Sequence, residues 1–171
     1  MTFDEFRQLR AYSRYDGIYL AVLWIAAFAC LICSSIYQPL SMMSILITLS
    51  TPFFVAYRLR IFRKEGLDGK VSFGRAFHYC LRVFFNAAIL FAIAQWAYMQ
   101  YVDNGRLASL FRTLTASDET KEALRQMGMD ANILTTVFEK VTPVEFASSY
   151  LVENILIGFI LSIIIAAVMK K

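Results

Sequence analysis

The chain has 171 residues, of which 58% are hydrophobic and 15% aromatic, with a net charge of +4 and a mean hydropathy of +0.54. This composition is far more apolar than that of an ordinary water-soluble domain, and the length leaves room for a few membrane spans rather than a separate soluble domain. The basic residues flank apolar runs, so membrane topology explains them better than nucleic-acid binding does.

The N-terminal half predicts an interfacial helix followed by two membrane spans. Residues 1–16 mix apolar and basic side chains at helical spacing, which is typical of an amphipathic helix lying in the membrane interface. The stretch from Gly17 to Tyr57 then contains no charged side chain. A helix needs about 20 apolar residues to cross a bilayer, so we expect spans over 17–37 and 40–57. The apolar run is too long for a cleaved signal peptide.

The middle of the chain predicts a basic connector and a third span. Residues 58–71 are rich in arginine and lysine and are expected to form a cytoplasmic connector. Ser72 is a good helix cap, and the helix that follows is expected over 73–101. Trp96 and Tyr101 lie near its far end, where aromatic side chains are typical of the membrane interface.

The last third predicts short helices and a fourth span. Residues 103–141 are the only sizeable polar segment, and their apolar side chains recur at helical spacing, which indicates short helices with one apolar side. Thr142, Pro143 and Glu145 combine a cap, a proline at the first helical position and an acidic third position. The fourth span is therefore expected over 143–169.

The expected fold class is an all-α integral membrane protein with four transmembrane helices in one membrane domain, 1–171. Basic residues are more numerous in the two tails and in 58–71 than in 103–141. The positive-inside rule then places both termini in the cytoplasm and segment 103–141 outside it.

A stripe of polar side chains enters the third span from its basic end. Arg75, His78, Arg82 and Asn86 recur at spacings of three or four and so share one helix face. They are candidates for holding an anionic lipid headgroup or a polyprenyl phosphate. The alternative is that Arg82 extends its side chain to the interface and that the rest is ordinary positive-inside charge.

Three further polar residues are expected inside the spans. Glu153 lies about a third of the way down the fourth span, and Gln95 is at a suitable level in the third span to hydrogen-bond with Glu153 or Asn154. An ionisable residue at such a depth is a functional candidate by default. The position of Glu153 therefore indicates either a carboxyl group that binds and releases protons or ions, or a structural carboxyl group that is held by hydrogen bonds.

Small side chains repeat every four residues in the first and fourth spans, a pattern that lets helix backbones approach closely. The repeats predict a compact bundle or the seam of a homo-oligomer. Their members are Ala26, Cys30 and Ser34 in the first span, and Gly158, Ser162 and Ala166 in the fourth.

The cysteines offer a weak redox hypothesis. Cys30 and Cys33 have C-x-x-C spacing, as in membrane thiol oxidoreductases, but the chemistry needs accessible thiolates. The only other cysteine, Cys80, is expected near the opposite membrane face. His78 is the only histidine, so no metal site or other cofactor is expected.

The order of these parts resembles the bacterial family of small four-span membrane proteins called DUF4199. The segments that carry the resemblance are 57–64 after the second span, 69–77 at the start of the third, and 155–171 at the end of the chain. The resemblance implies a protein of unknown activity in the bacterial inner membrane, and it transfers no catalytic residues.

These observations favour a non-enzymatic membrane protein, a structural or accessory subunit that binds lipid or a membrane partner. A small proton- or ion-coupled transporter or channel using Glu153 is the first alternative. A thiol oxidoreductase using Cys30 and Cys33 is the second and is disfavoured.

Overall fold

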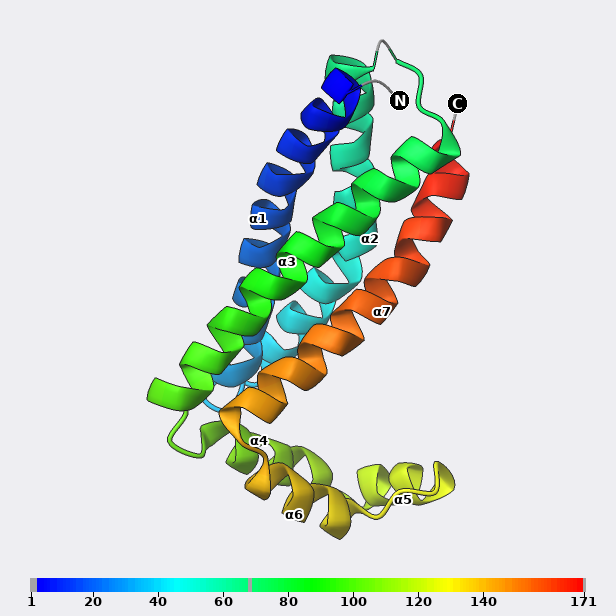
Figure 1. Cartoon of the computed structure of the whole chain (residues 1–171). Helices are drawn as coiled ribbons and strands as arrows, with labels where there is room; N and C mark the ends of the chain where they lie inside the picture. The colour runs from blue at the N-terminus through cyan, green and yellow to red at the C-terminus, as the bar shows by residue number, and fades with distance from the viewer. Residues whose placement is uncertain (1–2, 68, 171) are drawn as a thin grey trace.

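The computed structural model describes residues 3–67 and 69–170, which form a bundle of long helices with a layer of short helices across one end (Figure 1). Four helices are long and apolar enough to cross a membrane, which confirms an all-α protein with four candidate spans. The long helices are α1 (Phe3–Cys33), α2 (Pro39–Gly66), α3 (Phe73–Tyr101) and α7 (Pro143–Met169). The short helices are α4 (Arg106–Thr115), α5 (Asp118–Gln126) and α6 (Ala131–Lys140).

Two of the long helices differ in their bounds from those expected. The separate interfacial helix over 1–16 is continuous with the first span, because α1 runs without a break from Phe3 and ends at Cys33; residues 1 and 2 lie outside the described part of the chain. The segment 58–71 is not simply a connector, because α2 continues to Gly66. Leu59 and Phe62 are buried against the bundle, so tertiary packing extends the helix through the basic cluster.

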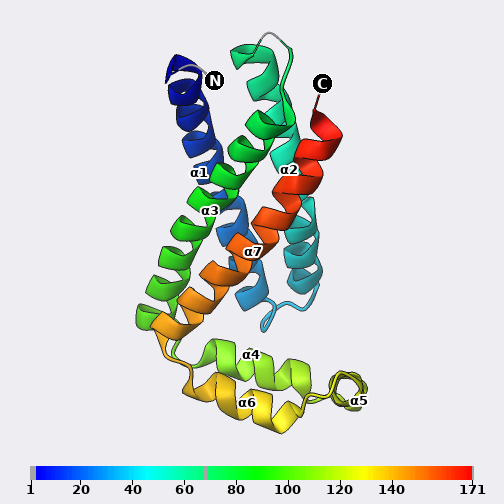
Figure 2. The same cartoon turned by 45° about the vertical axis from the view of Figure 1, so that its right-hand side comes forward.

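Helix α3 lies between α1 and α7 and has its most extensive contacts with these two helices (Figures 1 and 2). Helix α2 packs mainly on α1, on the outer side of the bundle. The two chain ends lie at the same end of the bundle, as an even number of spans requires. Most buried side chains of the main apolar core come from α1, α2 and α3.

The two repeats of small side chains have different outcomes. On α7, Gly158, Ser162 and Ala166 are all buried, and a Cβ atom at Gly158 would lie only 2.7 Å from the Cβ of Phe84 on α3. This repeat therefore allows the close packing of α3 and α7. On α1, Ala26 is exposed while Cys30 and Ser34 are half-buried, so the first repeat packs only partly within the chain, and its role as an oligomer seam stays a prediction.

Helices α4, α5 and α6 lie across the end of the bundle opposite the chain ends (Figure 2). The short helices expected within 103–141 are present, with Ser117 and Asp130 as side-chain caps. Thr142 and Glu145 form the expected capping box at the start of α7. On α4, Leu107 and Leu110 are buried against the ends of the long helices, so this layer closes one end of the bundle.

Candidate functional site

Three helices meet at a buried carboxylate near the end of the bundle that carries the termini. Asp16 of α1 is only 1% exposed. The Nε of Arg58 on α2 donates a hydrogen bond of 2.6 Å to one carboxylate oxygen of Asp16, and the hydroxyl of Tyr79 on α3 donates to the other. The Tyr79 ring stacks on Phe62 at a centroid distance of 4.8 Å.

This Asp16–Arg58–Tyr79 cluster is internally satisfied and acts as a structural tie between α1, α2 and α3. Charged groups within a membrane domain are tolerated when they pair with one another. The sequence signal for this pair is that Asp16 and Arg58 immediately flank the charge-free run from Gly17 to Tyr57. When such a run folds into a helical hairpin, its two ends meet, and the opposite charges then form a pair.

The predicted basic stripe does not converge on one point. The Arg82 guanidinium lies 4.9 Å from the centre of the Phe6 ring on α1, and the Asn86 amide donates to the Ser13 carbonyl oxygen at 3.4 Å. His78 is exposed, with its Nδ1 2.8 Å from the carbonyl oxygen of Gly74 one turn earlier in α3. Arg75 is half-buried on the same helix. Binding of an anionic headgroup by these residues stays a prediction.

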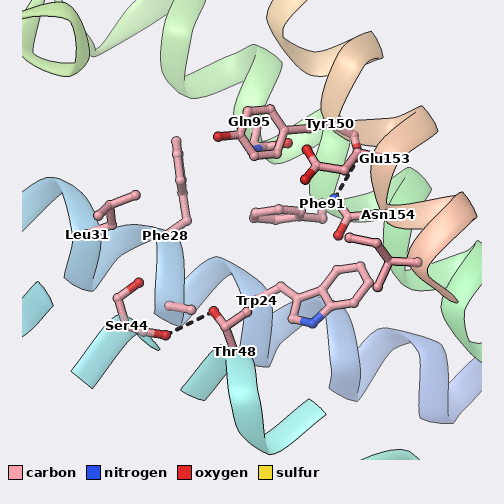
Figure 3. A pocket seen from close by; sticks show the side chains of 12 residues that line it. Trp24, Phe28, Leu31, Ser44, Thr48, Phe91, Gln95, Tyr150, Glu153 and Asn154 are labelled. Carbon is pink, nitrogen blue, oxygen red and sulfur yellow. Dashed lines mark hydrogen bonds between the residues drawn. The ribbon is translucent and has the colours of Figure 1, made fainter. Parts of the chain in front are cut away.

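A cavity of about 210 Å³ lies between all four long helices, nearer to the end covered by α4 (Figure 3). Its walls are mainly aromatic and aliphatic, with polar side chains from α3 and α7 on one side and two hydroxyl side chains from α2 on another. The lining residues are Trp24, Ala27, Phe28 and Leu31 of α1, Ser44 and Thr48 of α2, Phe91 and Gln95 of α3, and Tyr150, Glu153, Asn154 and Ile157 of α7.

The structure brings the three predicted intramembrane polar residues, Gln95, Glu153 and Asn154, to this one cavity. The expected hydrogen bond between them is not formed, since the Asn154 amide donates instead to the carbonyl oxygen of Tyr150 at 2.7 Å. Gln95 is 0% exposed. Its amide nitrogen and oxygen both lack a hydrogen-bond partner within the described part of the chain, which is rare for a buried polar side chain.

The cavity opens sideways, between α2 and α7. Thr48 and Glu153, on these two helices, are exposed, whereas Trp24 and Gln95 on the opposite wall are buried. Near the chain ends α2 and α7 are joined, because Arg63 donates to the carbonyl oxygen at the C-terminal end of α7 at 3.3 Å. The α4 residues Leu107 and Leu110 belong to a cluster that includes the cavity residues Phe28, Leu31 and Tyr150. The remaining opening therefore lies on the side of the bundle, between α2 and α7.

The cysteines do not form a disulfide within the described residues. Cys80 is fully buried in the main core, Cys33 is exposed and Cys30 is half-buried. Among residues 3–67 and 69–170, no group of three or more acidic, cysteine or histidine side chains is placed to hold a metal ion. The redox hypothesis stays a disfavoured prediction.

Comparisons with known proteins place the chain in a family but do not indicate an activity. No curated protein and no solved structure matches the chain. A family model described as a protein of unknown function, DUF4199, matches residues 15–171, which is nearly the whole chain. The chain therefore belongs to the DUF4199 family.

Proposed function

We propose that this protein binds an amphipathic small molecule or lipid within the membrane, in the cavity between the four long helices, without chemical conversion of the ligand. The observation that carries the proposal is the Gln95 side chain, which is completely buried at the cavity with both amide atoms unpaired among the described residues. An unpaired buried amide costs about 1–3 kcal/mol, and a ligand toward which this amide turns would remove that cost.

The shape and lining of the cavity support an amphipathic ligand. Ligand sites are typically concave and apolar with a few convergent polar groups. Here aromatic rings form one wall, and Gln95, Tyr150 and Glu153 bring polar groups together on the other side (Figure 3). A volume of about 210 Å³ suits a headgroup or a ring system rather than an entire phospholipid.

We also propose that the protein lies in the bacterial inner membrane with both termini in the cytoplasm. The excess of basic residues in the tails and around Arg58–Lys64 supports this orientation. The cavity then lies in the outer half of the bilayer. The basic stripe that includes Arg82, at the other end of α3, would contact anionic headgroups of the inner leaflet.

Replacing Gln95 with Met tests the proposal. Methionine has a similar length but no hydrogen-bonding amide, so Gln95→Met is expected to stabilise the empty protein by about 1–3 kcal/mol. It is also expected to reduce the retention of the natural ligand at least about tenfold, since a lost hydrogen bond leaves the ligand group unpaired. Mass spectrometry of small molecules extracted from protein purified in native-lipid discs measures retention.

Gln100→Met is the matched control for this variant. Gln100 lies on the same helix but is exposed, so its replacement is expected to change neither stability nor retention. The proposal would be contradicted if the Gln95→Met variant retained the same amount of ligand as the unmodified protein.

Transport coupled to Glu153 is the second candidate function, and the placement of this carboxyl at the cavity supports it. A binding protein predicts equal proton permeability for liposomes containing the unmodified protein and the Glu153→Gln variant, because its cavity opens on one side only. A pH-sensitive dye trapped in the liposomes measures the flux. Flux that requires Glu153 would favour the transporter instead.

A further inference from the structure

We infer that the ligand of this cavity carries a cationic headgroup, an ammonium or similar organic cation, that pairs with the Glu153 carboxylate among aromatic rings. The inference rests on the proposed function and specifies the chemical class of its ligand. Three observations carry it: the charge of the cavity lining, the arrangement of its rings and the unpaired acceptor of Gln95.

The charge of the lining is the first observation. Among the lining residues from all four helices, Glu153 and Tyr150 are the only titratable groups, and none is basic. No described residue forms an ion pair with Glu153; the ion pairs of the described residues include Asp16 with Arg58 and Asp118 with Lys121. A carboxylate within a membrane span normally has a partner. A cationic ligand supplies the missing charge.

The rings are the second observation. Trp24 and Phe28 lie one helical turn apart on α1, and both are in edge-to-face contact with Phe91 on α3, at centroid distances of 5.7 and 5.9 Å. Tyr150 adds a ring from α7. The faces of aromatic rings carry partial negative charge and attract organic cations, most strongly when water is absent.

The Gln95 amide is the third observation. Its oxygen is an unpaired acceptor beside the same space as Glu153 (Figure 3). Because the amide is fully buried, an ammonium N–H can donate to this oxygen only when the Gln95 side chain turns into the cavity. An anionic headgroup, by contrast, would meet the Glu153 carboxylate without any basic side chain in the lining to offset the repulsion.

The test uses the chain's two tryptophans, one inside the cavity and one outside. In a Trp96→Phe variant, Trp24 is the only tryptophan, and its fluorescence reports contact with a bromine-bearing probe. The probes are 4-bromobenzylammonium, which has N–H donors, and its uncharged isostere 1-bromo-4-ethylbenzene. Both are titrated in nanodiscs of zwitterionic lipid. In a Trp24→Phe variant, the remaining Trp96 lies outside this cavity but lines a second, apolar pocket between α3 and α7. Its fluorescence measures quenching by probe in the lipid or in that second pocket.

We expect saturable Trp24 quenching above the Trp96 reference, with the cation binding at least about tenfold more tightly than the isostere, as a desolvated cation–π and carboxylate contact would give. Glu153→Gln is expected to abolish this preference. Glu153→Asp, which keeps the charge, is expected to retain it and serves if the glutamine variant does not fold. Glu122→Gln, which removes an exposed carboxylate on α5, is expected to change nothing.

Three outcomes would overturn the inference. The first two are that the isostere binds as tightly as the cation, or that the Glu153→Gln variant keeps the preference for the cation. In either case the cavity binds a ligand for a reason other than the charge of the ligand, and the proposed function stands. If neither probe quenches Trp24 above the reference, the cationic class is excluded. If, in addition, Gln95→Met loses no co-purified molecule, the proposed function fails as well.

Discussion

Replacing Arg58 with Gln is expected to destabilise the protein by about 3 kcal/mol, toward the lower end of the range for breaking a buried ion pair, because Arg58 is itself 24% exposed. The variant leaves the Asp16 carboxylate buried, with only the Tyr79 hydroxyl as a donor. The three helices that meet at Asp16 then lose their shared charge pair. Unfolding of the purified protein in mixed micelles, followed by far-ultraviolet circular dichroism, measures the change.

Two variants separate the ion pair from a general effect of charge. Arg60→Gln removes the same charge from an exposed position on α2 and is expected to change stability by less than about 0.5 kcal/mol. The double variant Asp16→Asn with Arg58→Gln leaves no buried charge and is expected to recover much of the loss. If Arg58→Gln and Arg60→Gln unfold alike, Asp16 does not depend on its partner, and the cluster is not a structural tie.

The glycines on either side of α3 are expected to give the second large effect. A Cβ atom at Gly17 would lie 2.6 Å from the Cβ of Asn86, and one at Gly158 would lie 2.7 Å from the Cβ of Phe84. Each contact involves an atom fixed to the α3 backbone, so the helices must separate. Each alanine variant is expected to destabilise the protein by about 1–3 kcal/mol through overpacking, less the gain in helix propensity of up to about 1 kcal/mol.

Gly74→Ala is the matched control, because Gly74 also lies in a long helix but a Cβ atom added there would have no neighbour within 4 Å. It is expected to stabilise the protein by about 0.4–1 kcal/mol, since alanine restricts the unfolded chain. The same unfolding assay compares the three variants. Equal effects at Gly17, Gly158 and Gly74 would show that close helix approach does not limit these positions.

The four spans and the short helices could be predicted because hydropathy and capping residues are local signals. The boundary of α2 could not, since its extension to Gly66 depends on Leu59 and Phe62 meeting side chains from other helices. In the candidate site, counting helical rise placed Gln95 and Glu153 at one level. The same counting could not show that the Asn154 amide donates to the carbonyl oxygen of Tyr150 on its own helix. This hydrogen bond depends on the direction of the side chain rather than on its depth in the membrane.

The cavity itself was beyond sequence reasoning for a different reason. A void arises from the mismatch of four helix surfaces, and no single segment records it. The tie at Asp16 shows the same limit in part, because the charges that flank the first hairpin indicate Arg58, whereas nothing local indicates Tyr79 on α3. Residue types and spacing indicated which polar side chains lie within the membrane spans. Only the packing of the helices showed which of these side chains have a hydrogen-bond or ion-pair partner.

The closure of the bundle by α4 has a consequence for how ligands compete. Leu107 and Leu110 pack beside the cavity residues Phe28 and Leu31. Under the proposed function, a ligand would therefore reach the cavity from the bilayer, where its concentration depends on how strongly it partitions from water. Two compounds with equal complementarity to the site would then differ in apparent aqueous affinity by the ratio of their partition coefficients. Partitioning into the membrane would then discriminate between ligands before any of them contacts the protein.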